Sequence, residues 1–108
     1  MIYELRTYRV APGKMPDLLR RFEDHVLGAW EKAGIKPLGF WTTMIGASHL
    51  DLFYMLQWES LAEREKKWAS FNADQQWQEA RVASEREGVL VSSAANTILA
   101  PTGFSPLQ

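Results

Sequence analysis

Hydrophobic residues recur along the chain at two spacings, and each spacing predicts one kind of secondary structure. Runs of β-branched and aromatic residues predict strands over residues 2–10, 36–46 and 49–59. Between the first two runs, apolar residues recur every three or four positions, which predicts a helix over residues 14–33 that Gly34 ends. The short link between the second and third runs predicts an antiparallel hairpin.

Capping signals predict two more helices in the second half of the chain. Ser60 followed three positions later by Glu63 forms a capping box, which predicts a helix that ends near Asn72. Asp74 can cap a further short helix, and Gly88 is placed to end it. The helical region is therefore expected to break between these two signals.

The C-terminal part predicts a last strand and an irregular tail. Residues 89–100, "VLVSSAANTILA", are expected to form a strand that is bulged at its small residues. Two prolines within residues 101–108 exclude a regular continuation. Phe104 in this tail is expected to dock on a partner copy or on the back of the helices.

The order of the elements is strand, helix, strand, strand, helix pair, strand. Two right-handed crossovers of this kind give an α+β, ferredoxin-like βαββαβ fold, with a four-stranded antiparallel sheet covered by helices on one face. The first and third strands are then central. A length of 108 residues is typical of one domain, so residues 1–108 are expected to fold as a single unit.

Both faces of the sheet carry large apolar side chains, although helices can cover only one. Leaving such a side chain exposed forgoes roughly 1.5 to 3 kcal/mol. We therefore expect a homodimer in which a second copy packs sheet against sheet about a two-fold axis. The opposed sets are Leu52, Tyr54, Leu56 and Trp58 against Phe53 and Met55 in the third strand, and Leu38, Phe40 and Met44 against Trp41 and Ile45 in the second.

Composition and charge argue against several classes of site and partner, namely disulfides, thiolate metal sites, nucleic acid and membrane spans. The chain has no cysteine, which excludes disulfides and thiolate metal sites and fits a cytoplasmic location. A net charge of -1 lacks the basic surface that nucleic acid requires. No apolar run approaches the length of a membrane span, and no export segment is expected at the N-terminus.

Four separate segments together resemble the NIPSNAP family. They are "MIYELRTYRVAPGK", "GFWTTMIG", "WESLAERE" followed by "DQQW", and "FSP". The resemblance implies the dimeric α/β barrel, in which two ferredoxin-like sheets face each other. That fold is shared with antibiotic-biosynthesis monooxygenases, haem-degrading enzymes and chlorite dismutase-like proteins, so it does not identify a reaction. The resemblance leaves the biochemical role undefined.

Polar residues on the first strand are the main candidates for chemistry. Glu4, Arg6 and Tyr8 share one face of a central strand, so they must be paired or line a cavity. In a pocket, Arg6 would bind an anionic or carbonyl oxygen and Glu4 would fix Arg6 or move a proton. A structural ion pair or an interface contact is the alternative that we favour. His25 is a candidate base or haem ligand, although a satisfied histidine at a helix border is favoured, and His49 is expected in an exposed loop.

Aromatic residues on the strands are the candidates for ligand binding. Trp41, Tyr54 and Trp58, together with Tyr8, could wall a cavity for a flat apolar ligand. Trp30, Trp68 and Trp77 on the helices are assigned to packing.

Two functions of different class stay open. The first is a dimeric module that binds a small ligand or serves as a scaffold, with aromatic residues building its core and interface. The second is a cofactor-independent monooxygenase or isomerase-like enzyme that acts on a small apolar or aromatic ligand. No cofactor and no metal site are expected, because the chain lacks a phosphate loop and metal-ligand spacing.

Overall fold

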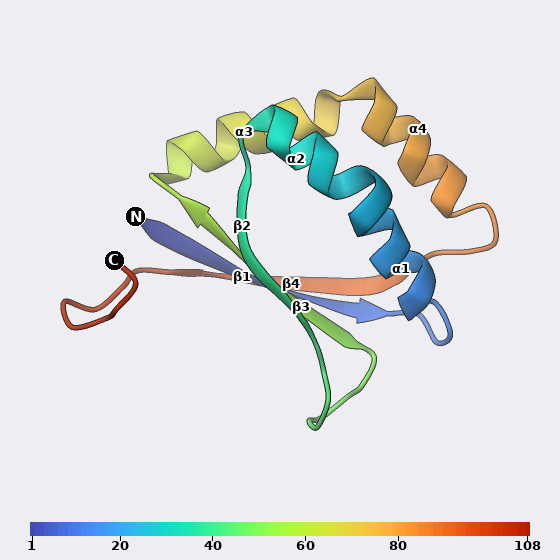
Figure 1. Ribbon diagram of the computed structural model, residues 1–108, viewed down its shortest axis with the longest axis horizontal. Coiled ribbons are helices and arrows are strands. Elements are labelled where there is room, and N and C mark those ends of the chain that lie inside the picture. Colours follow the sequence, from blue (N-terminus) through green and yellow to red (C-terminus); the bar gives the residue numbers. More distant parts are fainter.

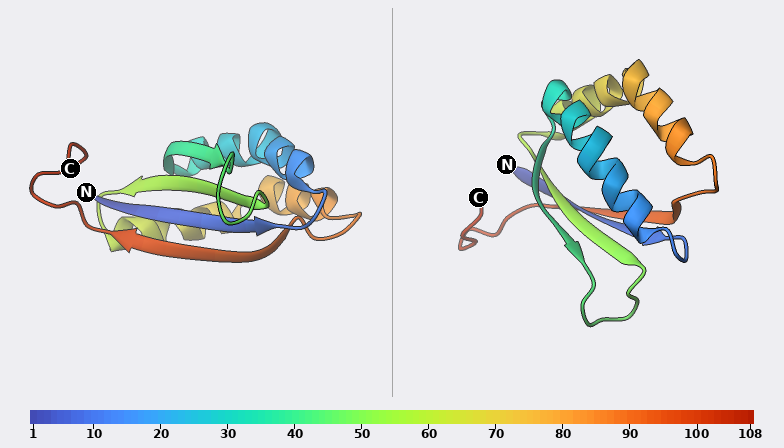
Figure 2. Two further views of the ribbon diagram at one scale, coloured as in Figure 1. Left: turned by 90° about the horizontal axis from the view of Figure 1, so that it is seen from below. Right: turned by 45° about the vertical axis from the view of Figure 1, so that its right-hand side comes forward.

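The computed structural model describes residues 1–108 and confirms the ferredoxin-like arrangement. The sheet has the strand order β2-β3-β1-β4, so β1 and β3 are central as predicted, and every pair is antiparallel. Figures 1 and 2 show the helices on one side of the sheet and the two termini close together. The elements are β1 (Ile2–Val10), α1 (Met15–Arg21), η1 (Phe22–Val26), α2 (Leu27–Ala33), β2 (Lys36–Thr42), β3 (Asp51–Trp58), α3 (Leu61–Ala73), α4 (Gln75–Ser84) and β4 (Val91–Leu99).

The first predicted helix is continuous but contains a π-helical turn, η1. Four of its buried residues, Leu18, Phe22, Val26 and Trp30, are spaced by four positions. Residues at this spacing drift by about 40° per step around an α-helix, because the α-helix has 3.6 residues per turn. The wider turn of η1 absorbs part of that drift and keeps all four side chains on the sheet. Gly34 ends the helix in the left-handed conformation, with φ of 81°.

The capping residues that were predicted begin the next two helices. The hydroxyl of Ser60 accepts a hydrogen bond of 3.1 Å from the Glu63 amide, and the Glu63 carboxylate accepts one of 3.3 Å from the Glu59 amide. The Asp74 carboxylate accepts one of 3.1 Å from the Trp77 amide. The helical region therefore breaks at Asp74 because this carboxylate begins a new helix there.

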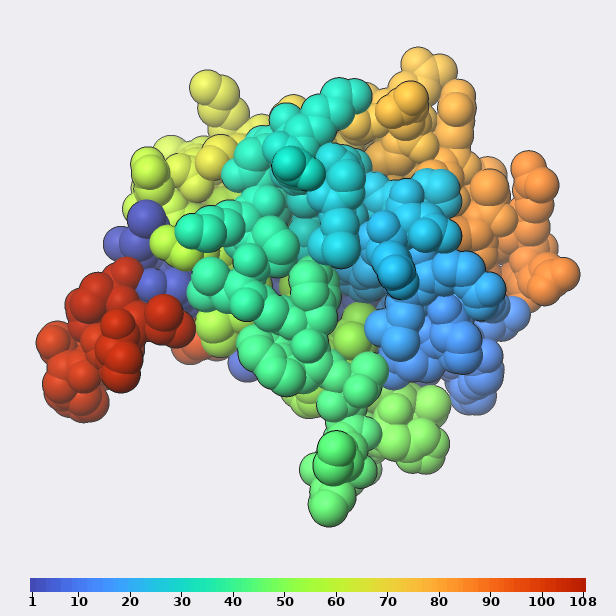
Figure 3. Space-filling view, viewed as in Figure 1, coloured from blue at the N-terminus to red at the C-terminus, as the bar shows by residue number.

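The second strand is shorter than predicted. It ends at Thr42, and Met44 and Ile45, which were expected on its two faces, are each 94% exposed in the loop to β3. Hydrogen bonds turn the chain just before β3, where Ser48 accepts from the amides of Leu50 and Asp51. The residues beyond Thr42 consequently have no strand to pair with, and their loop projects from the body of the molecule (Figure 3).

The last strand carries the predicted bulge. Arg9 pairs with Ser93 and Val10 with Val91, which leaves Ser92 as the extra residue in β4. The Ser92 hydroxyl donates a hydrogen bond of 2.9 Å to the Arg9 carbonyl, so the irregular position is anchored. The bulge lies at a small residue, as expected.

The C-terminal tail returns to the sheet through its last residue. The Tyr3 hydroxyl donates a hydrogen bond of 2.6 Å to the Gln108 carbonyl oxygen. Phe104 is 89% exposed, so the prediction that it docks on the helices is wrong. Docking on a partner copy stays a prediction.

Between sheet and helices lies a core dominated by aromatic rings. Leu52, Tyr54, Leu56 and Trp58 are fully buried beneath the helices, while Phe53 and Met55 point to the other face, as predicted. Trp30 contacts the rings of Phe22, Phe40, Tyr54, Trp68 and Phe71, with centroids 5.6 to 6.2 Å apart. None of the helices has the length and apolar character needed to cross a bilayer.

Replacing Leu56 by alanine should lower the free energy of unfolding by about 2 to 5 kcal/mol, because it opens a cavity in this core. Urea unfolding at one protein concentration measures the loss. The control is Leu61→Ala, since Leu61 is exposed. Equal losses in the two variants would contradict the placement of the core.

Candidate functional site

The carboxylate of Glu4 lies at the centre of a buried polar network. Its side chain is fully buried on the helix-covered face of β1 and accepts five hydrogen bonds. Arg64 donates two of them, from Nε at 2.7 Å and Nη2 at 3.0 Å. The other donors are Arg6 Nη1 at 3.0 Å, Trp58 Nε1 at 3.0 Å and Asn96 Nδ2 at 2.9 Å.

Each donor reaches Glu4 because of local structure in a different element. Trp58 ends β3, and Ser60 begins α3 directly afterwards, so the first turn of α3 holds Arg64 above the end of the strand. Asn96 lies opposite Arg6 in the pairing of β4 with β1. One carboxylate therefore connects β1, β3, β4 and α3.

These hydrogen bonds determine the protonation state of Glu4. Burial alone raises the pKa of the Glu4 carboxyl, but the hydrogen bonds from Arg64, Asn96 and Arg6 outweigh burial and lower it from 4.5 to about 2. Glu4 is thus a carboxylate at neutral pH with its lone pairs occupied. This geometry favours a structural ion pair over a role in moving protons.

Arg6 connects Glu4 to a chain of two tyrosines. Arg6 Nε donates to the Tyr54 hydroxyl at 2.6 Å, and the Tyr54 hydroxyl donates to the Tyr8 hydroxyl at 2.8 Å. The Arg6 guanidinium also lies over the ring of Trp68, 5.0 Å from its centroid. Burial and the neighbouring Tyr8 raise the pKa of Tyr54 far above its usual value. The Tyr8 hydroxyl accepts hydrogen bonds from Arg6 and Tyr54 and donates to no group of the chain.

Three of the four residues predicted to bind a ligand lie on the same face of the sheet, and the fourth, Trp41, lies on the opposite face. Tyr8, Tyr54 and Trp58 share the helix-covered face of the sheet. Trp41 pairs with Phe53 and lies on the opposite face, where it is 53% exposed. A Cβ added at Gly39 would lie 2.7 Å from the Trp41 ring, so the glycine leaves room for the indole over the strand.

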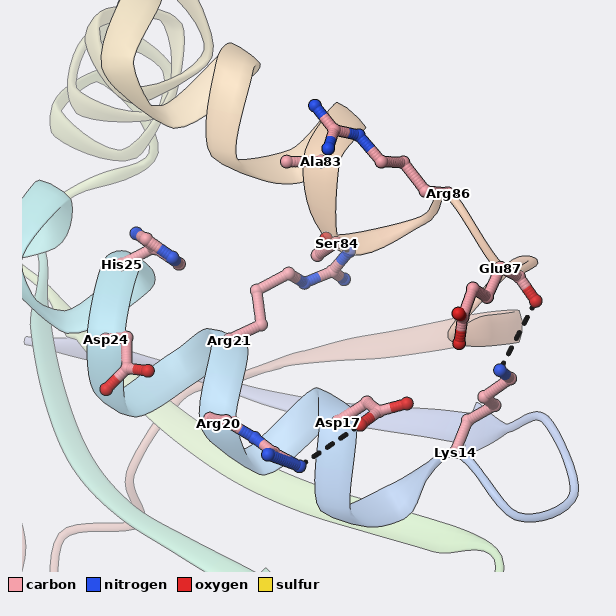
Figure 4. Close-up of a pocket in the computed structure, with 10 residues that line it drawn as sticks. All are labelled: Lys14, Asp17, Arg20, Arg21, Asp24, His25, Ala83, Ser84, Arg86 and Glu87. Carbon is pink, nitrogen blue, oxygen red and sulfur yellow. Dashed lines mark hydrogen bonds and ion pairs between the residues drawn. The ribbon is translucent and has the colours of Figure 1, made fainter.

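The two histidines lie away from the sheet. His25 is exposed in η1 and faces the groove between the helices, not the sheet face that it could have reached from a helix border (Figure 4). His49 is exposed in the loop before β3, as expected. The main hollows of the surface are not lined by Arg6, Tyr8, Trp41 or Tyr54, although Trp58 borders a small one near the N-terminus.

The sequence patterns did not single out Arg64 or Asn96. Arg64 follows a capping box by one residue and looks like part of a charged helix surface. Asn96 is the polar member of the alternating set Ala94, Asn96 and Ile98, which was the available signal that this face of β4 meets a polar group.

Replacing Glu4 by glutamine should lower the free energy of unfolding by roughly 3 to 5 kcal/mol at pH 7, because two guanidinium groups lose their shared counter-charge. The folded pKa of about 2 lies below the unfolded value of 4.5, so the stability that Glu4 provides is complete above pH 4.5 and disappears as the pH falls toward 2. The difference between the two proteins should therefore shrink over this range, which urea unfolding at several pH values measures.

Glu65→Gln is the matched control, since Glu65 is exposed on the same helix as Arg64 and makes no ion pair. A Glu4→Gln protein that is as stable as this control at pH 7 would contradict the structural role of the network.

Comparison with known proteins gives the same fold and one family. Residues 3–106 match the family model described as NIPSNAP. A NIPSNAP family protein of Agrobacterium tumefaciens is 31% identical, with a TM-score of 0.88 over 99% of this chain and 98% of that one. A crystallised mutant of MhuD, with two manganese protoporphyrin IX molecules bound per active site, is 22% identical with a TM-score of 0.60 over 94% of each chain, which shows likeness of fold alone.

Among curated proteins, human "Protein NipSnap homolog 3A" is 27% identical over 79 residues, which cover 73% of this chain. The match spans only 31% of the human protein, so most of that protein has no counterpart in this match. The family model, in contrast, extends over nearly the whole sequence, and on this ground the chain belongs to the NIPSNAP family.

Proposed function

We propose that this chain is a homodimeric binding or scaffold module in which two copies pack sheet against sheet. The observation that carries the proposal is the chemistry of the sheet face that no helix covers, which we name the open face. Its two central strands present Leu5, Phe53 and Met55 beside Thr7, and its edges add further aromatic and aliphatic groups. The apolar residues of the open face are Leu5, Trp41, Phe53, Met55 and Leu99, while Tyr3 on the same face is buried and bonds to the C-terminal tail.

The open face carries little charge. Only Arg9 and Asp51 are charged among its residues in β1 and β3, and they pair with each other at 2.6 Å at one end of the strands. The middle of the face therefore presents no unpaired charge to a partner. A face of this kind can be buried without the cost of desolvating an ion.

The size of the open face suits a second copy. Four strands spaced by about 4.8 Å, each about eight residues long, cover roughly 500 Å² in projection, and the relief of the side chains increases the accessible area. A stable interface needs about 800 Å² per partner. A second copy offers an identical sheet of the same size and apolar character, so a two-fold axis through this face makes the contact self-complementary.

The polar groups on the helix-covered face of the sheet favour a binding or scaffold function over a catalytic one. Glu4 has its lone pairs occupied, and the guanidinium of Arg6 is held by Glu4, Tyr54 and Tyr8. A catalytic carboxylate needs a pKa nearer the working pH and a path to a substrate. The network therefore has a structural role: its hydrogen bonds and ion pairs stabilise the register of the central strands and the position of α3 above them.

One observation favours the alternative function, a cofactor-independent monooxygenase or isomerase-like enzyme. The chain of donors from Arg6 through Tyr54 ends at the Tyr8 hydroxyl, whose proton has no acceptor in the protein. A ligand with a carbonyl or phenolate oxygen could accept that proton. The structurally similar MhuD mutant binds two manganese protoporphyrin IX molecules per active site, which supports a ligand-binding role for this fold.

The dimer predicts the effect of a single charge on the open face. Met55→Asp should convert the protein from dimer to monomer at micromolar concentration, because the new carboxylate would be buried against the partner without a counter-ion. Sedimentation velocity measures the change. Met44→Asp is the control with the same substitution in the exposed loop, and it should stay dimeric. A wild-type protein that sediments as a monomer would end the proposal.

The enzyme alternative predicts a bound small molecule that depends on Tyr8. Native mass spectrometry of the purified dimer should then show added mass that is absent from Tyr8→Phe and retained by Tyr3→Phe, since Tyr3 bonds only to the tail. Spectra without added mass in all three proteins would favour the scaffold, provided that the dimer is intact.

A further inference from the structure

A polar groove lies on the helical layer, on the side of the sheet away from the open face. It separates α1 and η1 from the C-terminal end of α4 and has a volume of about 390 Å³. Only one of its ten lining residues is hydrophobic, which suits a hydrophilic ligand. Figure 4 shows the lining side chains, which are Lys14, Asp17, Arg20, Arg21, Asp24, His25, Ala83, Ser84, Arg86 and Glu87.

A buried arginine with unused donors lies at the centre of the groove. Arg21 is only 9% exposed, and its guanidinium packs over the ring of Trp77 at 5.5 Å. Its Nη1 donates to Ser84 Oγ at 3.3 Å and to Glu85 Oε1 at 3.1 Å. Nε is buried without a partner, and Nη2 donates to no group of the chain. A guanidinium so far removed from water normally has more of its five donors satisfied.

Further cations surround Arg21, and two of them have no carboxylate partner. Arg86 makes no ion pair, and Lys14 Nζ contacts only the main-chain carbonyl of Glu87, at 3.3 Å. Arg20 is neutralised by Asp17 at 3.1 Å. Arg21 itself is paired with Glu85, so the unpaired cations of the groove are Arg86 and Lys14, and the free N–H donors belong to Arg21.

The two ends of the groove carry carboxylates, whereas its centre carries the guanidinium of Arg21. Asp24 and His25 lie at one end on η1, and Glu87 lies at the other end beyond α4 (Figure 4). Neither carboxylate forms an ion pair within the groove. Carboxylates in this position accept hydrogen bonds from hydroxyl groups.

We propose that this groove binds the phosphate ester of a small polyol. The phosphate lies at the centre, where Arg21 Nη2 donates to its oxygens and Arg86 and Lys14 add positive charge from either side, and the hydroxyl groups extend toward one unpaired carboxylate at an end of the groove. Arginine suits this task because its planar fork donates two parallel hydrogen bonds to phosphate. The volume of about 390 Å³ exceeds what phosphate alone occupies, which leaves room for the polyol.

Isothermal titration calorimetry with glycerol 3-phosphate, inorganic phosphate and glycerol tests the proposal on the intact protein. Glycerol 3-phosphate should bind more tightly than inorganic phosphate, and glycerol should produce no binding heat. Because Arg21 is buried against Trp77, replacing it would also disturb the packing of the helices. The informative variant is therefore Arg86→Gln, since Arg86 is exposed and unpaired. It should weaken binding of glycerol 3-phosphate by about tenfold.

Arg81→Gln is the matched control, because Arg81 is exposed on α4 outside the groove. It should leave the affinity unchanged. The proposal is overturned if glycerol 3-phosphate gives no binding heat up to about 10 mM, which corresponds to less than about 3 kcal/mol of binding free energy. Equal weakening by Arg86→Gln and Arg81→Gln, or equal affinity for the ester and inorganic phosphate, would overturn it as well.

Discussion

The buried carboxylate of Glu4 is the interaction on which the rest of the structure depends. Three strands and one helix send donors to it, and two of those donors are partly buried arginines that would otherwise have no counter-charge. Because each donor is needed to offset the desolvation of the carboxylate, the network tolerates only one register of β1 against β3 and β4. The position of α3 is coupled to that register through Arg64. A single charged group thereby links the order of the sheet to the layer of helices above it.

This arrangement divides the sheet into two faces with different roles. The helix-covered face is occupied by the Glu4 network and by packed aromatic rings, so the protein's own groups satisfy almost all of its polar atoms. The open face has no such partners, and its residues Leu5, Phe53 and Met55 belong to the same two central strands that Glu4 holds in place. In the proposed dimer, a rigid helix-covered face thus supports a flat apolar face for the second copy. The polar groove between the helices lies outside both and can bind its ligand without disturbing the interface.

The sequence predicted the elements better than the contacts between them. Ser60, Asp74 and Gly34 act through groups a few residues away, so their patterns were sufficient to place the ends of helices. The alternation in β3 correctly separated Leu56 and Trp58 from Phe53 and Met55. The partners of Glu4 were not predictable in this way, because Arg64 and Asn96 are 60 and 92 residues away in the sequence. Trp41 was grouped with Tyr54 because both lie on predicted strands, whereas the pairing of β2 with β3 puts it on the other face.

A crystal structure of the purified protein tests the central claim most directly, because it shows what covers the open face. Our account predicts two copies related by a two-fold axis, with their sheets about 10 Å apart and with Leu5, Phe53 and Met55 closed off from solvent between them. It would be contradicted by copies that meet through their helices while these three side chains contact solvent.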